Sequence, residues 1–335
     1  MASREFKIFY PHYIDIDEPI SKIHKEIATQ LGPKFSVTAF ASDQNIPRQS
    51  GIDKLISVST DSNIVAKTTQ YARAYFQPWD LVHTGPSRRH HLGLLSHLRG
   101  STLVHTLHST PKNKRVIERQ RRLSHKADYV TAVSPYVESW AREILGIQEN
   151  LRTIPNGIKL ADYEQLDQED RDGHILYVGR LIQRKHPELI IRIAKIMPER
   201  EFKVCGSGPL ESTLREDAPE NVEVLGYASR DKVRSLYSNA LTTLCPYERE
   251  GFGLVVVESF ASGTPVIGYK SGNLPHLLTD KSGIICETLT PENWRSAITA
   301  VSDNIKQFSP YERAEKYKWE TIGKLYRRFY CTILK

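Results

Sequence analysis

The sequence predicts an α/β protein built from two doubly wound, Rossmann-like domains that face each other across a cleft. Short β-rich runs alternate with helical patterns along the chain, which is typical of parallel sheets covered by helices on both faces. A polar, acidic stretch from Leu160 to Gly173 interrupts this alternation, and a second α/β series begins after it. The length of 335 residues suits two domains of ordinary size.

The first domain is expected to span residues 1–160. Its first helix should run from Ile20 to Leu31 and end at Gly32, because the apolar residues recur at helical spacing. Another helix should begin at Ser134, a favoured N-cap that is followed by proline at the first helical position. The expected strands are residues 6–10, 35–40, 81–83, 101–107 and 129–133.

The second domain is expected to span residues 161–312. Its expected strands are residues 174–178, 201–205, 222–225, 241–245 and 265–268. Residues 311–335 then show one long helical pattern that carries Trp319 and Tyr326. We expect the segment 313–335 to form a helix that crosses back and packs on the first domain.

Composition excludes several classes of protein. The chain is 39% hydrophobic and 25% charged, as in a globular protein, and it has no apolar run of the roughly eighteen residues that span a membrane. The amino terminus lacks the apolar segment of a secretory signal. The four cysteines are far apart in sequence, without the spacing of a zinc or redox site. These features predict a cytoplasmic protein.

The segment from Glu250 to Glu258 (EGFGLVVVE) carries the strongest functional signal. A glycine-bearing loop follows a strand, and a helix is expected to start at about Phe252. Gly251 and Gly253 allow close approach of the backbone to a ligand, and the free N–H groups of a helix start suit a diphosphate. The two glutamates can accept hydrogen bonds from sugar and ribose hydroxyls. On their own they are also compatible with a capped helix that carries incidental acids.

Two more segments follow strands of the same expected sheet. Arg180 comes directly after the strand 174–178, and Lys185 follows five residues later. Such cations at the carboxyl end of a parallel strand can neutralise a diphosphate. Gly206 and Gly208 form a tight loop after the strand 201–205.

In these motifs the chain resembles the group 1 retaining glycosyltransferases, which are also called family four and have the GT-B fold. The matching segments are residues 127–134, 154–158, 178–181, 206–209, 250–258, 261–266 and 271–272, together with Pro275. The resemblance implies a metal-independent hexosyltransferase that uses a UDP- or GDP-sugar as a substrate and needs no cofactor. The acceptor would be a lipid-linked compound or a saccharide.

The resemblance also implies roles for individual residues. Glu250 would bind the donor sugar hydroxyls, while Arg180 and Lys185 would hold the diphosphate. His108, which follows the strand 101–107, would contact the transferred sugar near the acceptor. The other implied donor-binding residues are Gly206, Gly208, Tyr227, Gly251, Phe252, Gly253, Leu254 and Glu258.

The implied mechanism retains the anomeric configuration by front-side attack, with the leaving phosphate helping to deprotonate the acceptor. No metal is expected, because neither His105 with His108 nor His90 with His91 has carboxylates at ligand spacing.

Two other functions remain open from the sequence. One is a nucleotide-sugar epimerase on the same fold, and the other is a catalytically weak subunit that binds the donor. The second is kept open by residues 11–19, which lack the paired glycines that the family usually has after its first strand.

A basic segment lies at residues 112–126, with seven Lys and Arg residues against one acid. The first 150 residues hold 20 Lys and Arg against 14 Asp and Glu, so most of the net charge of +7 lies in that half. The segment is compatible with a helix that contacts an anionic membrane surface and equally with a solvated helix face. It has no aromatic residues for stacking on bases, so nucleic acid is not an expected partner.

Overall fold

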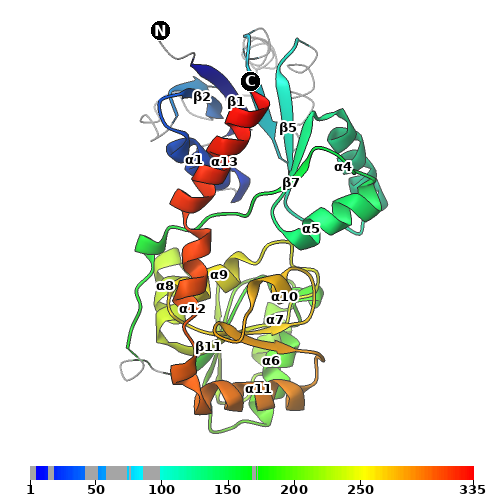
Figure 1. Cartoon of the computed structure of the whole chain (residues 1–335). Helices are drawn as coiled ribbons and strands as arrows, with labels where there is room; N and C mark the ends of the chain where they lie inside the picture. The colour runs from blue at the N-terminus through cyan, green and yellow to red at the C-terminus, as the bar shows by residue number, and fades with distance from the viewer. Residues whose placement is uncertain are drawn as a thin grey trace. The chain divides into compact units, whose positions relative to one another are not determined.

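The structure, a computed structural model, describes residues 5–13, 19–41, 52–57, 74, 77–85, 99–167, 171 and 173–335. The chain forms two compact units, each with its own parallel sheet (Figure 1). The first unit runs to Gly157 and resumes at Trp319, and the second spans Ile158–Lys318. The predicted fold class, with two doubly wound α/β domains, is confirmed.

The sheet of the first unit has seven strands in the order β3-β2-β1-β4-β5-β6-β7. They are β1 Phe6–Tyr13, β2 Phe35–Ala41, β3 Lys54–Ser57, β4 Leu81–Thr84, β5 Thr102–Leu107, β6 Tyr129–Ala132 and β7 Leu151–Thr153. All neighbouring strands are parallel. The sequence did not predict the short strands β3 and β7. The strand order reverses between β1 and β4, which is a topological switch point.

The following helices of the first unit lie within the described residues. They are α1 Pro19–Leu31, α4 Lys114–Lys126, α5 Pro135–Trp140, a π-helical turn η1 Ala141–Leu145, and α13 Trp319–Ile333. Helices α1 and α13 lie side by side (Figure 1). The C-terminal helix therefore belongs to the core of the first unit, to which it contributes Trp319, Ile322, Tyr326 and Tyr330.

The C-terminal segment differs from the single helix that the sequence predicts over residues 311–335. It forms α12 Pro310–Ala314, a 3-10 turn η6 Glu315–Tyr317, and then α13. Lys318 between them is extended, with φ −63° and ψ 143°, because the chain pairs there with Ile158, whose N–H donates to the Tyr317 carbonyl at 2.8 Å.

The boundaries between the units also differ from those that the sequence predicts. Helix α12 packs on α9 of the second unit, so that unit ends at Lys318 rather than at residue 312. The first unit ends at Gly157 rather than at residue 160. At this point the Trp319 ring covers Gly157 so closely that an added Cβ would lie 2.3 Å from the ring.

The sheet of the second unit has six parallel strands in the order β10-β9-β8-β11-β12-β13. They are β8 His174–Val178, β9 Phe202–Cys205, β10 Val222–Gly226, β11 Ala240–Cys245, β12 Val266–Tyr269 and β13 Gly283–Cys286. Strand β13 was not predicted. The order reverses between β8 and β11, so the loops that follow these two strands flank the crevice in which open α/β sheets bind ligands.

In the described part of the second unit, seven α-helices surround this sheet (Figure 1). They are α6 Glu188–Lys195, α7 Glu211–Asp217, α8 Arg230–Asn239, α9 Leu254–Ala261, α10 Leu274–Leu277, α11 Pro291–Asp303 and α12. Short 3-10 turns occur at η2 Leu160–Asp162, η4 Gln183–Lys185 and η5 Ile305–Gln307. Among the described residues, no helix is long and apolar enough to cross a membrane.

Candidate functional site

The candidate site of the second unit lies at the carboxyl ends of its strands. Because all six strands are parallel, the loops after β8, β9, β10 and β11 emerge at one edge of the sheet. These loops carry Arg180, Gly206 with Gly208, Tyr227, and Glu250, respectively. The structure therefore brings the predicted donor-binding segments to one edge, around the switch point between β8 and β11.

Lys185 and Glu250 face each other across this switch point. Lys185 ends the turn η4 and is only 8% exposed. Its Nζ lies 3.3 Å from Oε2 of Glu250 and 3.9 Å from the ring centroid of Tyr247. The Tyr247 hydroxyl donates a hydrogen bond to the carbonyl of Val178 at the end of β8. The cation is thus held by one carboxylate and one aromatic face.

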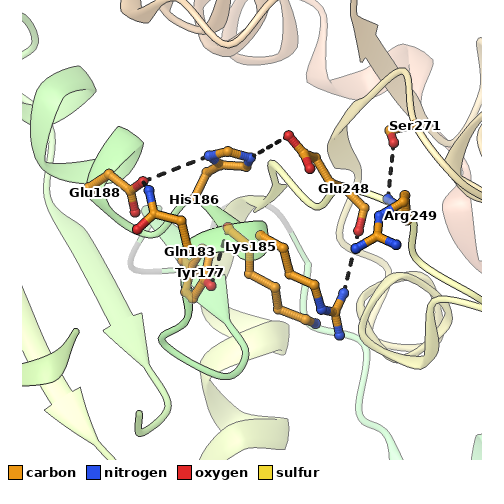
Figure 2. A network of polar contacts seen from close by, with 9 residues as sticks. Tyr177, Gln183, Lys185, His186, Glu188, Glu248, Arg249 and Ser271 are labelled. Atoms are coloured by element: carbon orange, nitrogen blue, oxygen red, sulfur yellow. Dashed lines mark hydrogen bonds and ion pairs between the residues drawn. The ribbon is translucent and has the colours of Figure 1, made fainter. Parts of the chain in front are cut away.

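The loops that carry this pair are joined by further polar contacts, which Figure 2 shows. The N–H of Glu248 donates to the carbonyl of Arg184 at 2.9 Å, and the Arg184 guanidinium donates to the carbonyl of Glu248 at 3.4 Å. The imidazole of His186 lies between the carboxylates of Glu188 and Glu248 (Figure 2). The segment 184–186 is therefore attached to the loop after β11 through main chain and side chains.

The glycines after β9 allow two loops to interlock. A Cβ on Gly206 would lie 1.8 Å from the Gly179 carbonyl oxygen, and one on Gly208 would lie 2.4 Å from that of Leu181. The N–H of Leu181 donates to the Ser207 carbonyl at 2.9 Å. This contact fixes the loop from which Arg180 extends as an exposed side chain.

Helix α9 begins at Leu254, slightly later than the predicted start at about Phe252. Gly253 is the reason, because its φ of 99° lies outside the helical region and makes it the cap. A side chain there would also collide with Leu277, at 2.7 Å from its Cδ1. No side chain caps this helix, so its first N–H groups are not satisfied by a cap and point out of the helix end.

Asn273 supports the loop before α9 from within the unit. This side chain is 2% exposed, and its Nδ2 donates to the Phe252 carbonyl at 2.8 Å. Its backbone N–H donates to the carbonyl of Glu250 at 2.9 Å. The backbone on both sides of Gly251 is therefore held by one buried residue.

Glu258 lies within α9, and its carboxylate accepts a hydrogen bond from the Tyr237 hydroxyl at 3.1 Å. Burial raises the pKa of Glu258, and hydrogen bonds from Tyr237 and Tyr163 oppose that rise. Tyr227 is 82% exposed directly after β10. An exposed aromatic ring of this kind can stack on a planar ligand.

His108 belongs to the first unit, where it directly follows β5. Its Nε2 is shielded from solvent and makes no hydrogen bond within the described residues. Burial lowers the pKa of His108 to about 4. The imidazole is therefore neutral at physiological pH and can contact a ligand without adding positive charge.

No group of three or more His, Cys, Asp or Glu side chains with the arrangement of a metal site occurs among the described residues. His90, His91 and residues 14–18 lie outside the part of the chain that the structure describes.

Several residues that build the site were not predicted from the sequence. They are Tyr163, His186, Tyr237, Tyr247, Glu248 and Asn273. Tyr247 and Glu248 lie between the end of β11 and the glutamate motif. Their position after a parallel strand could therefore have indicated that they belong to the site. Tyr163 and Tyr237 come from distant parts of the chain, and no local pattern links them to Glu258.

Solved structures with the same fold define the class of this protein. Sucrose-phosphate synthase from Thermosynechococcus elongatus aligns over 98% of this chain and 100% of its own, with a TM-score of 0.79 and 20% identity. HepE from Anabaena, solved with UDP-glucose, aligns over 98% and 100% of the two chains, with a TM-score of 0.80 and 16% identity. The chain thus has the two-domain GT-B fold of glycosyltransferases.

Sequence comparisons then identify the family. Residues 160–318 match the family described as "Glycosyl transferases group 1", and residues 33–162 match "Glycosyltransferase Family 4". This protein belongs to the group 1 glycosyltransferases.

Two curated relatives illustrate the range of the similarity. An uncharacterized glycosyltransferase of Methanocaldococcus jannaschii is 24% identical over 73% of this chain and 73% of its own length. A D-inositol 3-phosphate glycosyltransferase of Acidothermus cellulolyticus is 28% identical over 67% of this chain, and the match spans 60% of its length.

Proposed function

We propose that this protein is a retaining, metal-independent glycosyltransferase that moves a sugar from a UDP- or GDP-sugar to a lipid-linked or saccharide acceptor. The observation that carries the proposal is the Lys185–Glu250 pair at the switch point, with a distance of 3.3 Å between Nζ and Oε2. A sugar nucleotide presents a diphosphate next to sugar hydroxyls, and this pair offers a cation next to a carboxylate.

Similar proteins support a nucleotide-sugar donor. HepE has been solved with UDP and with UDP-glucose. A relative from Corynebacterium glutamicum, 25% identical over 50% of this chain and 51% of its own length, is a GDP-mannose-dependent mannosyltransferase of a phosphatidylinositol mannoside. Both bases are therefore candidates for the donor of this protein.

The donor is held along the edge of the second sheet. Arg180 and Lys185 bind the diphosphate together with the N–H groups at the start of α9. The two side chains supply positive charge, and the helix start supplies hydrogen-bond donors for the phosphate oxygens. Glu250 accepts from hydroxyls of the sugar, and Glu258 from the ribose. Gly206 and Gly208 keep the neighbouring loop close, and the exposed ring of Tyr227 stacks on the base.

The transfer then needs no covalent enzyme intermediate. The bond from the anomeric carbon to the diphosphate oxygen breaks, and the acceptor oxygen bonds to the same face of that carbon. The acceptor proton passes to an oxygen of the leaving diphosphate. Arg180 and Lys185 stabilise the departing charge without a metal ion. His108, neutral because burial lowers its pKa to about 4, makes a hydrogen bond to the transferred sugar.

A donor panel tests this proposal. The purified chain is incubated with UDP- and GDP-sugars and with saccharide or lipid-linked acceptors, in buffer with and without EDTA, and release of nucleoside diphosphate is followed. We expect release that persists in EDTA and is lost in Glu250→Ala, with an anomerically retained product by NMR. Conversion of the donor sugar without an acceptor would indicate an epimerase, and tight nucleotide binding without turnover would indicate a donor-binding subunit.

The acceptor side includes helix α4, which begins after the N-cap Asn113. The apolar Leu123 of this helix is buried. The Arg121 side chain donates a hydrogen bond to the carbonyl of Ile144, and the residue Ile144 is 40% exposed. The exposed cations of this segment are Lys112, Lys114, Arg115, Arg122 and Lys126. We infer contact with an anionic membrane surface, because α4 carries these exposed cations and packs against the turn η1, which exposes the apolar Ile144.

Vesicle sedimentation tests this contact. We expect binding to vesicles with phosphatidylglycerol that falls with added salt, is weak for phosphatidylcholine alone, and is reduced in Arg115→Glu/Arg122→Glu. Charge reversal at Arg295 and Lys306, two exposed cations of the second unit, is the matched control. Equal binding of both double variants would contradict a role for α4.

A further inference from the structure

His186 has a backbone conformation that is uncommon for a residue with a side chain. Its φ of 45° and ψ of 48° place it in the left-handed region, which favours glycine and disfavours branched or bulky residues. Among the described residues, only Asn150, His186 and Arg249 combine a positive φ with a side chain. His186 directly follows Lys185, and Arg249 directly precedes Glu250. Such conformations persist where the surroundings hold them and cluster at functional sites.

The imidazole of His186 contacts carboxylates from two other segments of the chain. Its Nε2 lies 3.1 Å from Oε1 of Glu248, and its Nδ1 lies 3.8 Å from Oε1 of Glu188 (Figure 2). Glu188 opens α6, whereas Glu248 belongs to the loop after β11. One ring therefore connects the start of a helix after β8 with the loop after the strand on the other side of the switch point.

This connection lies directly beside Lys185. Arg184, the residue before Lys185, accepts a main-chain hydrogen bond from Glu248, with 2.9 Å between the Glu248 nitrogen and the Arg184 oxygen. Glu248 therefore contacts the residue before Lys185 and, through the His186 ring, the residue after it. These two contacts fix the backbone of the turn on both sides of Lys185. The long lysine side chain is otherwise rotatable, so a fixed backbone limits where its Nζ can lie.

We propose that His186 is a positioning residue of the donor site, which holds Lys185 in register with Glu250 by clamping the turn 183–186 to Glu248. Its link to donor binding rests on the proposed function, because Lys185 is the residue that binds the diphosphate there. The clamp itself is a property of the protein without any ligand.

Three variants of the full chain separate the side chain from the backbone. His186→Gly removes the imidazole while the backbone can still adopt a positive φ. Glu248→Ala removes the other end of the clamp, and the double variant completes a cycle that measures their coupling. Asn150→Gly is the matched control, because Asn150 has a similar φ of 52° but lies in the first unit. Circular dichroism and thermal unfolding check that each variant is folded.

The first measurement needs no nucleotide. The protein is treated briefly with an amine-acetylating reagent, and the rate of modification of Lys185 is followed by mass spectrometry. We expect Lys185, 8% exposed in the wild type, to react about threefold faster or more in His186→Gly and Glu248→Ala, because local opening controls access to buried groups. The double variant should react no faster than either single one. An unchanged rate in folded His186→Gly overturns the proposal.

The second measurement is the affinity for UDP and GDP by calorimetry. We expect the two single variants and the double variant to bind about tenfold more weakly than the wild type, a change of about 1.4 kcal/mol, whereas Asn150→Gly binds like the wild type. Faster acetylation with unchanged affinity overturns the link to donor binding. If the wild type binds neither nucleotide while acetylation still responds to His186→Gly, the proposed function fails and the clamp is supported.

Discussion

The ammonium group of Lys185 lies 3.3 Å from Oε2 of Glu250, with side-chain exposures of 11% and 20%. The two charges neutralise each other in a partly shielded place, where an unpaired charge would be costly. A diphosphate would supply an alternative partner for Lys185 and leave Glu250 available to accept from a hydroxyl. In the proposed donor site, this one pair would therefore supply both the cation that binds the diphosphate and the carboxylate that binds a sugar hydroxyl.

Replacing Lys185 by methionine should weaken nucleotide binding and also destabilise the fold. The charge that attracts the diphosphate is lost, and a hydrogen bond to a charged group contributes about 1.5–3 kcal/mol, so we expect a roughly 10- to 100-fold rise in the dissociation constant for UDP or GDP. Glu250 is left without its cation, so the free energy of unfolding should fall as well. Calorimetry and urea denaturation measure the two effects.

The double variant Lys185→Met/Glu250→Gln is the control. Removal of both charges should restore much of the stability but not the affinity, because the second change relieves the unpaired carboxylate without replacing the cation. Recovery of both properties would contradict a role for Lys185 in binding.

Gly206→Ala should be among the most damaging single-methyl changes in the second unit. Its φ of 146° is unfavourable for alanine, and the new Cβ would lie 1.8 Å from the Gly179 oxygen. We expect a loss of about 3 kcal/mol or more in the free energy of unfolding, since the clash is with main chain. Gly173 has a positive φ of 76°, and an added Cβ would have no described atom within 4 Å, so Gly173→Ala should lose only about 1–2 kcal/mol. Similar losses for the two variants would contradict this contact.

The fold was largely predictable because its signals are local. Buried parallel strands such as His174–Val178 form apolar runs, and alternation with helices specifies a doubly wound sheet. Strands β3 and β7 lie at the two edges of their sheet and bury few side chains, so they lack the apolar run that marks a buried parallel strand. The break at Lys318 was missed because pairing with Ile158 overrides the helical pattern.

The position of a candidate site residue in the fold was predictable where one segment carries both the loop and the residue. The glutamate motif and Arg180 are of this kind, since each follows a strand directly. The Lys185–Glu250 contact and the His186–Glu248 contact join residues more than sixty positions apart. Their geometry depends on strand order, and β8 and β11 become neighbours only in the folded sheet.

Tyr237→Phe should change the pH dependence of nucleotide binding. Burial raises the pKa of Glu258, and the hydrogen bond from Tyr237 limits the rise. In the proposed site an ionised Glu258 accepts more strongly from the ribose than a protonated one, so affinity falls as pH drops through this raised pKa. Loss of the Tyr237 hydroxyl should raise the pKa of Glu258 further. The fall in nucleotide affinity at low pH, called the acidic limb below, should therefore begin at a higher pH. Calorimetric titrations of UDP or GDP between pH 4.5 and 8 measure the shift.

Two matched variants show whether Glu258 is the group that titrates. Glu258→Gln should weaken binding and remove this part of the pH dependence. Tyr269→Phe, on strand β12, should leave the limb where it is. An acidic limb that persists unchanged in Glu258→Gln would contradict the assignment.

The half-buried imidazole of His108 should make the fold less stable in mild acid. Burial lowers its pKa to about 4 from the usual 6.5. Between these values the unfolded chain takes up a proton that the folded chain does not bind, so the free energy of unfolding decreases as pH falls from about 6.5 to about 4 and this contribution levels off below. The size should be roughly 1–3 kcal/mol. In His108→Asn, which lacks a titrating ring, urea denaturation across this range should show a flatter dependence. The control is His276→Asn, at an exposed position of the second unit, in which the free energy of unfolding should depend on pH as in the wild type. Equal pH dependence in the wild type and in His108→Asn would contradict the prediction, because it would show that His108 takes up its proton in the folded state.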